Sequence, residues 1–455
     1  MTTLSQLRGA FVAAMLSEPA RHARERLRSW MRGATGRARR LELFWLASDP
    51  YSHLLAQALT RLLPVLPLEL DLVVLPEPAV DVDPEPELRR AFALRDAAEV
   101  APHFGLAFPA APSPPDAALV ARAEAVLLRR RAAAEQLEVA VQVGAALWAR
   151  DAAALGALEA AHGAVPADEC EELLGRAVAL ARARGHYRGG MVYYEGEWYG
   201  GVDRVQTLLE RLRAEGLADA HGLAWQALDR LQASPHDTPP PASVAPIFRA
   251  AARPGRARGS GATRRPKLEL FFSFRSPYSY LALSRTKHFA LSYPVDLELR
   301  PVLLGGLAMP AHKRRYIVAD AKREADRLAL PFGRICEPLG LGVERCLAAF
   351  EHAEGLGRGF ELMQSVMRGI WAEARDPASD ADLRFVVERA GLPWRPVRRA
   401  LGEAAWRARV ADNAAALRDA GLWGVPSFRI GDFTTWGQDR IPLVERRIRD
   451  TLGWP

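Results

Sequence analysis

The feature that most constrains the fold of this chain is a long internal repeat. Residues 41–52 read LELFWLASDPYS and residues 268–279 read LELFFSFRSPYS, an offset of 227 positions (41 to 268). Three later landmarks recur in the same order, the last being Gly201-Val-Asp-Arg204 against Gly437-Gln-Asp-Arg440. Four ordered matches at a nearly constant offset predict two copies of one domain, because solenoid repeats are much shorter.

The segment between the two copies has a composition that is typical of a linker. Residues 234–246 read SPHDTPPPASVAP and residues 253–265 read RPGRARGSGATRR, and such mixtures of proline, glycine, serine and arginine cannot bury a core. The predicted organisation is a basic helical arm, a first domain, a linker and a second domain, at residues 1–37, 38–232, 233–266 and 267–455.

Both copies show the same coarse order of secondary structure. In the second copy this order is a strand, a helix opened by Ser-Pro, a second strand, a helical region, a β-hairpin and a last helix, at residues 267–274, 277–290, 295–304, 307–422, 426–437 and 438–452. A short crossover between two strands implies a parallel pair. The pattern therefore predicts an α/β fold with two tandem thioredoxin-like domains, each carrying a helical insertion.

The second copy also carries a family resemblance. It lies in the segments FRSPYSYL, RPVLLGG, KRRY, GVPSF and WGQDR, at residues 274–281, 300–306, 313–316, 424–428 and 436–440. Together these segments resemble the family of 2-hydroxychromene-2-carboxylate isomerases and kappa-class glutathione transferases, whose fold is DsbA-like. The resemblance implies glutathione as the cofactor and a small aromatic carboxylate or related electrophile as the substrate.

Ser276 is the predicted catalytic residue. In dithiol relatives the same helix start holds a C-x-x-C pair whose first thiolate the helix dipole stabilises, whereas this chain has Ser-Pro-Tyr-Ser. A serine forms no disulfide, but its hydroxyl can donate to a thiolate that a ligand brings. The resemblance assigns this contact to Ser276 and places Pro277 and Tyr278 beside it. The alternative is that Ser276 is simply a helix N-cap.

The remaining site residues come from the resemblance. Pro426 is expected to be cis, which would turn the backbone of Val425 toward a peptide-like ligand; an ordinary trans proline is the alternative. Gln438 and Asp439 are expected near the γ-glutamyl end of glutathione, although Asp439 also suits a first helical turn. Lys313 is expected near the glycyl carboxylate, in a loop that is short and lacks the asparagine usual in the family.

The first copy departs from this pattern at its helix start. Asp49 replaces the serine, and a carboxylate there would repel a thiolate while still capping the helix. We place Met191 at the position of Pro426 and Arg89 at the position of Lys313. The first copy is therefore predicted to be non-catalytic and to pair with the second domain within the chain.

Composition excludes several classes of function. The three cysteines form neither a C-x-x-C pair nor a zinc motif, so no metal site and no dithiol oxidoreductase are expected, and a reducing, cytoplasmic location is predicted. The formal net charge is +7, with arginines gathered at residues 21–40 and 253–265. Such runs could contact nucleic acid or anionic lipid, but without a recognised nucleic-acid motif they favour solvated segments, so a nucleic acid is not an expected partner. No apolar run approaches the roughly 20 residues that span a bilayer, so a membrane is not an expected partner either.

Two functions of different classes remain for the whole chain. The first is an enzyme, a glutathione-dependent isomerase or transferase that acts on conjugated carbonyl compounds. The second is a non-catalytic binding or scaffold protein on a degenerate thioredoxin fold, since a fold alone does not establish a function.

Overall fold

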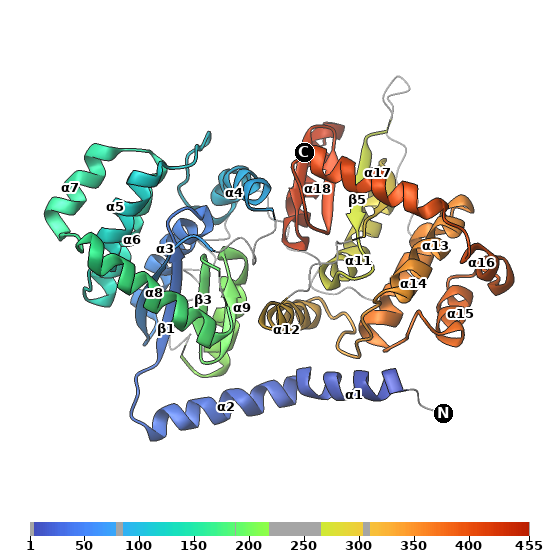
Figure 1. Cartoon of the computed structure of the whole chain (residues 1–455), viewed down its shortest axis with the longest axis horizontal. Helices are drawn as coiled ribbons and strands as arrows, with labels where there is room; N and C mark the ends of the chain where they lie inside the picture. Colours follow the sequence, from blue (N-terminus) through green and yellow to red (C-terminus); the bar gives the residue numbers. More distant parts are fainter. Residues whose placement is uncertain (1–3, 79–84, 187, 218–264, 304–309, 455) are drawn as a thin grey trace. The chain divides into compact units, whose positions relative to one another are not determined.

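The computed structural model describes residues 4–78, 85–186, 188–217, 265–303 and 310–454 (Figure 1). The chain divides into two compact units. The N-terminal unit comprises His22–Pro240 and Met309–Tyr316, and the C-terminal unit comprises Met1–Arg21, Pro241–Ala308 and Ile317–Pro455. Most of the predicted linker lies outside the described residues, and the predicted domain boundaries stay predictions.

The C-terminal unit contains one mixed sheet in the order β6-β5-β7-β8. Its strands are β5 (Lys267–Phe272), β6 (Asp296–Pro301), β7 (Ser427–Ile430) and β8 (Phe433–Trp436). β5 pairs in parallel with β6 and antiparallel with β7, and β7 and β8 form a hairpin. The predicted parallel pair and the predicted hairpin are confirmed, and the hairpin turns at Gly431-Asp432.

Helices complete this unit and supply most of its core. They are α1 (Leu4–Leu16), α11 (Pro277–Ser292), α12 (Ala311–Arg327, from Ile317), α13 (Leu341–Gly355), α14 (Gly359–Ala372), α15 (Asp380–Arg389), α16 (Trp394–Ala400), α17 (Ala405–Asp419), the 3₁₀ turn η4 (Gln438–Arg440) and α18 (Ile441–Leu452). On α14, Met363, Met367, Ile370 and Trp371 recur at a helical spacing and are buried in the core, and Phe360 packs against it partly buried. The predicted last helix opens as a 3₁₀ turn, before Pro442 enters the first turn of α18.

The N-terminal unit has a second mixed sheet in the order β2-β1-β3-β4. Its strands are β1 (Arg40–Leu46), β2 (Glu69–Leu75), β3 (Met191–Tyr194) and β4 (Glu197–Gly200). Its helices are α2 (Glu18–Ala34, from His22), α3 (Pro50–Leu62), α4 (Pro86–Val100), α5 (Ala117–Leu128), α6 (Ala133–Trp148), α7 (Ala152–His162), α8 (Ala167–Arg184) and α9 (Val205–Ala214), with 3₁₀ turns η1 (Leu63–Val65), η2 (Ala101–Phe104) and η3 (Val202–Arg204).

The two sheets have the same order and the same strand directions. β1 is parallel to β2 and antiparallel to β3, as β5 is to β6 and β7. In both units a helix begins directly after the first strand, so that the loop leading into that helix lies at the carboxyl end of the two parallel strands. Loops at this edge are where ligands bind in open α/β sheets.

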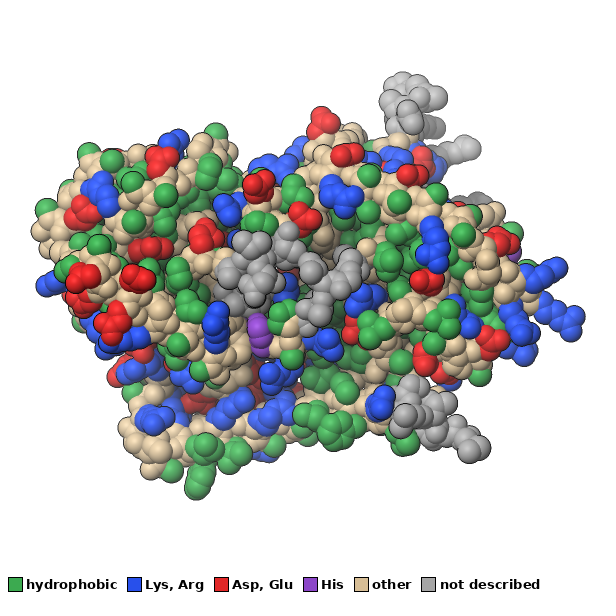
Figure 2. Space-filling model, in the orientation of Figure 1, with side chains coloured by type: hydrophobic (Ala, Val, Ile, Leu, Met, Phe, Trp, Pro, Cys, Tyr) green, Lys and Arg blue, Asp and Glu red, His purple; other side chains and the backbone are tan. Residues whose placement is uncertain are grey.

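Among the described residues, no helix has the length and apolar character that a membrane crossing requires. The surface in Figure 2 nevertheless shows hydrophobic side chains exposed along helix α2 together with basic ones. Among the large hydrophobic side chains of α2, Leu27, Trp30 and Met31 are exposed.

Glu269 is a buried carboxylate in the middle of the C-terminal sheet. It lies opposite Arg429 on β7, which donates to it at 2.7 Å, while Arg300 on β6 donates at 2.6 Å. Burial alone would raise the pKa of this carboxyl, but the bonds and charges of Arg429 and Arg300 outweigh it and hold the pKa below its usual value. The three strands are thereby tied together by charge as well as by backbone bonds.

Glu269→Gln should lower the free energy of unfolding at pH 7 by about 2 kcal/mol, because bonds to a charged acceptor are lost. A depressed pKa stabilises the fold above the unfolded value, near pH 4, so the difference should vanish as the pH falls through the lower folded value. Urea unfolding at several pH values measures it. Glu298→Gln, a half-buried neighbour on β6, should cost less than about 1 kcal/mol. Equal losses would contradict the central role of Glu269.

Candidate functional site

Ser276 lies at the turn between β5 and α11 and is almost fully buried, at 4% exposure. Its Oγ accepts a bond of 3.1 Å from the backbone N–H of Ser279, which makes it the N-cap of α11. The same hydroxyl donates to the carbonyl oxygen of Val425 at 3.2 Å. Capping and contact with the loop before β7 are therefore combined in one side chain.

The peptide bond between Val425 and Pro426 is cis, as expected. The carbonyl of Pro426 accepts from the N–H of Gly437 at 2.8 Å, which joins the start of β7 to the end of β8. Ser427 Oγ donates to the carbonyl of Gly424 at 2.7 Å and closes the loop on itself. Ser276 thus faces a loop whose backbone is fixed from both sides.

Tyr278 reaches away from this loop to helix α12. Its hydroxyl donates to Asp320 Oδ2 at 2.8 Å, and Arg323 lies 3.3 Å from the other oxygen of that carboxylate. Asp320 is 1% exposed, so its bonds replace the water it has lost. Sequence reasoning selected Tyr278 but missed Asp320.

Gln438 is buried at 1% exposure and connects three elements of the C-terminal unit. Its Oε1 accepts from Arg285 of α11, and its Nε2 donates to Glu324 of α12 at 3.1 Å and also to Asp439. Glu324 follows Asp320 by one helical turn, so the two buried carboxylates lie on one face of α12. The amide of Gln438 therefore orients Asp439, the residue next to it.

Lys313 falls in the segment Met309–Tyr316, which groups with the N-terminal unit. Burial lowers the pKa of His186 in that unit to about 3, and the charges of Arg188, His312 and Lys313 add to the effect. The shortened loop before Lys313 lies largely outside the described residues, at 304–309. Its role toward Ser276 stays a prediction.

The chain's own cysteines are poor nucleophiles. All three are free. Burial raises the pKa of Cys336 to about 11, and it raises the pKa of Cys346, which is fully buried, further still. Burial also raises the pKa of Cys170. Because the thiolate is the reactive form, these thiols are not suited to redox or nucleophilic chemistry at neutral pH.

The N-terminal unit repeats the strand-to-helix turn with Asp49 as the cap. Asp49 accepts from the N–H of Tyr51, and Ser52 Oγ accepts from the N–H of Leu46 at 3.0 Å, as Ser279 Oγ does from Ser273. Burial raises the pKa of the Asp49 carboxyl, although the charges of Arg89 and Arg188 oppose the rise. Asp49 therefore still caps the helix, but it places a buried carboxyl group where the C-terminal unit has the hydroxyl of Ser276.

The strand register corrects the position assigned to Met191. Phe44 of β1 lies opposite Met191, whereas its counterpart Phe271 of β5 lies opposite Ser427. The counterpart of Pro426 is therefore Gly190, whose carbonyl accepts from Gly201 at 2.8 Å. A Cβ on Gly190 would come within 2.7 Å of Asp49 Oδ2, so the larger cap faces the residue without a side chain.

Some polar contacts of the C-terminal unit recur at the corresponding positions of the N-terminal unit, and others do not. The Tyr278–Asp320 bond recurs as Tyr51–Asp96, at 2.5 Å. The buried set around Gln438 does not recur. By the offsets of their elements, Arg285, Glu324 and Gln438 correspond to residues that are apolar and buried: Ala58, Val100 and Val202.

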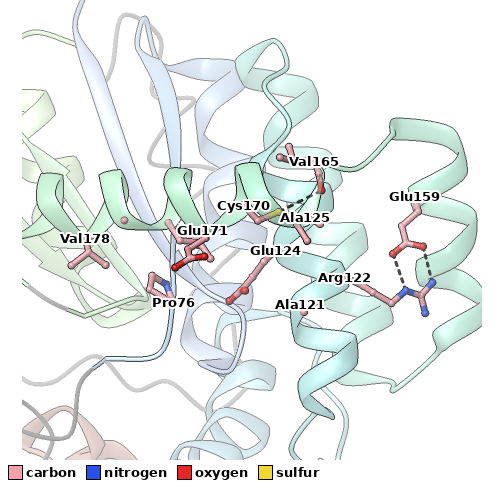
Figure 3. A pocket seen from close by; sticks show the side chains of 13 residues that line it. Pro76, Ala121, Arg122, Glu124, Ala125, Glu159, Val165, Cys170, Glu171 and Val178 are labelled. Carbon is pink, nitrogen blue, oxygen red and sulfur yellow. Dashed lines mark hydrogen bonds and ion pairs between the residues drawn. The ribbon is translucent and has the colours of Figure 1, made fainter.

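A separate hollow of about 600 Å³ lies in the N-terminal unit between α5, α7 and α8 (Figure 3). Glu124 lies on its wall, where burial, followed by the charge of Glu77, raises its pKa to about 7. The Arg122–Glu159 ion pair, at 2.8 Å, lies at its edge. The described residues that line it include none of the predicted site residues.

Comparison with known proteins relates the C-terminal part of the chain to one family. Residues 267–449 match the DSBA-like thioredoxin domain. The 2-hydroxychromene-2-carboxylate isomerase of Pseudomonas putida is 24% identical over 190 residues, which are 39% of this chain and 92% of that protein. Glutathione S-transferase kappa 1 of Rattus norvegicus is 23% identical over 204 residues, 39% of this chain and 88% of that protein.

Solved structures are similar over the same share of the chain. A structure of 2-hydroxychromene-2-carboxylate isomerase is 23% identical with a TM-score of 0.36, and covers 41% of this chain and 98% of its own. The cytosolic disulfide reductase DsbM from Pseudomonas aeruginosa with GSH is 19% identical with a TM-score of 0.32, and covers 40% and 99%. The C-terminal domain is thus DSBA-like, with distant homology to isomerases and a kappa-class transferase.

Asp49→Asn should stabilise the chain at pH 8, because the amide can still cap α3 without a buried charge. A raised folded pKa destabilises the fold increasingly as the pH rises from the unfolded value, near pH 4, through the folded value. The gain should therefore be absent below about pH 4 and grow above it. Thermal unfolding against pH measures it, and a variant that is less stable at pH 8 would contradict the electrostatic description of this turn.

Proposed function

We propose that the C-terminal unit binds glutathione at the Ser276 turn and catalyses an isomerisation or transfer on a conjugated carbonyl compound derived from an aromatic molecule. The observation that carries the proposal is the placement of Ser276. It is a buried N-cap hydroxyl at the start of a 16-residue helix, and it contacts the loop of the cis proline. The distant homology of this region to isomerases and a kappa-class transferase supports the same chemistry.

The residues at this turn fit a thiolate. The first N–H groups of a helix carry partial positive charge and favour an anion. The Ser276 proton now points to the carbonyl of Val425, and rotation about the Cβ–Oγ bond would turn it to a ligand sulfur. The Oγ atom keeps its bond from Ser279 throughout, so the helix cap is not lost.

The other predicted residues take distinct roles in this proposal. Val425 presents backbone groups to the peptide part of the ligand, and Asp439 holds the ammonium of the γ-glutamyl end. Gln438 acts through Asp439, since its own amide is occupied by Arg285 and Glu324. Pro277 and Tyr278 fix the helix start.

When bound, glutathione supplies a thiolate that can add reversibly to a carbon–carbon double bond conjugated with a carbonyl. The addition leaves a single bond that can rotate before the thiolate is eliminated again. The part of the protein in this step is to hold the sulfur ionised and in place. Ser276 and the helix start lower the free energy of the charged form, and the burial of the site excludes water.

The N-terminal unit is proposed to be a non-catalytic copy that arose by duplication and pairs with the C-terminal domain. The common sheet order and the recurring Tyr–Asp bond support a common origin. Asp49 in place of Ser276, and apolar residues in place of the buried Gln438 set, support the loss of ligand binding. A binding or scaffold role for the whole chain is the alternative that the first experiment below separates.

Calorimetric titration should show one glutathione bound per chain. Ser276→Ala should raise the pKa of the bound thiol by about one to two units, since a hydrogen bond to a charged group is worth about 1.5–3 kcal/mol. Thiolate absorbance against pH gives this value. Asp49→Asn is the matched control in the other unit and should change neither quantity. If the wild-type chain binds no glutathione, the enzyme proposal fails and the scaffold remains.

Replacing Arg285, Glu324 and Gln438 by the corresponding residues of the N-terminal unit tests their role. The triple variant Arg285→Ala, Glu324→Val, Gln438→Val installs the residues of the N-terminal unit, so it should fold while binding glutathione at least about tenfold more weakly through a mispositioned Asp439. Circular dichroism and titration separate the two effects. Tyr278→Phe, which breaks the bond common to both units, should mainly reduce stability. A triple variant that binds as well as wild type would leave this set only a structural role.

A further inference from the structure

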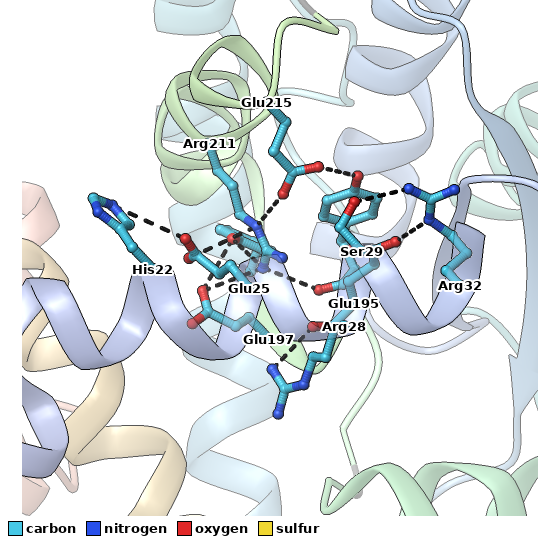
Figure 4. A network of polar contacts seen from close by, with 11 residues as sticks. His22, Glu25, Arg28, Ser29, Arg32, Glu195, Glu197, Arg211 and Glu215 are labelled. Atoms are coloured by element: carbon cyan, nitrogen blue, oxygen red, sulfur yellow. Dashed lines mark hydrogen bonds and ion pairs between the residues drawn. The ribbon is translucent and has the colours of Figure 1, made fainter. Parts of the chain in front are cut away.

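Helix α2 is attached to the N-terminal unit by its polar side. Arg28 donates to the carbonyl of Glu195 at 2.9 Å, Arg32 donates to the Glu195 carboxylate at 2.5 Å, and Glu25 lies 3.8 Å from Arg211 (Figure 4). Glu195 belongs to the turn between β3 and β4. Charged groups rather than apolar contacts therefore hold this helix in place.

The turn is shaped to receive this helix. Gly196 has a φ of +91°, and a Cβ at this position would lie 2.0 Å from Arg28 Nη1. The left-handed backbone favours glycine here, and the missing Cβ leaves room for the guanidinium. Arg28 thus packs against Gly196 and bonds to Glu195, and this contact sets which face of α2 points toward the N-terminal unit.

This orientation leaves the apolar side of α2 in solvent. Leu27, Trp30 and Met31 are 55%, 69% and 51% exposed, and the flanking positions Ala23 and Ala34 are exposed as well. These residues follow the i, i+4, i+7, i+8, i+11 spacing of one helix face. A surface helix normally buries that face and exposes its charges, whereas α2 does the opposite.

Basic side chains border this apolar face, which we name the Trp30 face. Arg24 and Arg26 on the helix and Arg37 after it are exposed, and Figure 2 shows basic and apolar side chains side by side along α2. An apolar face with tryptophan, flanked by arginines, is the composition of a helix that lies in the interface of an anionic bilayer. A second copy of the same basic helix would meet like charges.

We propose that the Trp30 face binds the surface of an anionic lipid membrane. The helix lies parallel to the surface, with Leu27, Trp30 and Met31 among the headgroups and upper acyl chains and the arginines against lipid phosphates. This binding is independent of the glutathione site. The sequence expectation of no membrane partner considered stretches long enough to span a bilayer and the arginine runs as solvated segments. A helix that lies on a membrane surface needs no spanning segment, and here the arginines border an exposed apolar face.

Flotation of the full chain with phosphatidylcholine vesicles, with and without phosphatidylglycerol, tests the proposal. The chain should bind the anionic vesicles, and salt should weaken the binding. Leu27→Ser, Trp30→Ser, Met31→Ser should lower binding at least about tenfold, because the apolar insertion is lost. Arg26→Gln, Arg37→Gln should lower it about fivefold for each arginine.

The matched control removes exposed apolar side chains elsewhere, through Leu339→Ser, Leu341→Ser, Phe385→Ser in the C-terminal unit. This control should bind vesicles as wild type does, and circular dichroism should show that every variant is folded. Equal binding to neutral vesicles, equal loss in the control, or absence of vesicle binding by wild type would overturn the proposal. Self-association of wild type that the Trp30-face variant abolishes, without vesicle binding, would identify a second copy as the partner and also overturn it.

Discussion

The turn that joins the first strand to the first helix is the constraint on which each unit depends. A serine hydroxyl accepts from a backbone N–H at the end of the strand (Ser52) or directly after it (Ser279). The cap residue, Ser276 or Asp49, accepts from the helix start. These bonds fix where the helix begins relative to the sheet. The loop before the third strand then has to leave room for the cap. Pro426 lies in the loop that faces the smaller cap Ser276, and Gly190 lies in the loop that faces the larger cap Asp49.

Much of this arrangement could be predicted from the sequence, because the strands are short aromatic runs and Ser-Pro or Asp-Pro marks the helix starts. The parallel pair and the hairpin followed from these signals, whereas the cis proline was expected from the family resemblance. The position of Met191 was wrong by one residue, since an offset that drifts between landmarks cannot fix a register that backbone pairing decides. The partners Asp320 and Glu324 were missed because helical acidic residues are usually solvated, and only packing buries them.

The two units together separate structural from functional polar groups without reference to any other protein. The Tyr–Asp bond occurs in both, so it belongs to the requirements of the fold. The set of half-buried Arg285 with buried Glu324 and Gln438 occurs in one unit, although the other unit shows that alanine and valine satisfy the same positions. Burying polar groups costs free energy that apolar residues avoid, which makes this set a candidate for retention by function.

The seat of Arg28 on Gly196 has a consequence for how the first unit unfolds. Since α2 is attached through charges and buries little apolar area, its release would add little to the heat capacity or to the denaturant dependence of unfolding, both of which follow exposed surface. The detachment of α2 should therefore depend on ionic strength and change little with urea concentration. A calorimetric transition of this chain would report the unfolding of the two sheets and would barely change with the state of α2.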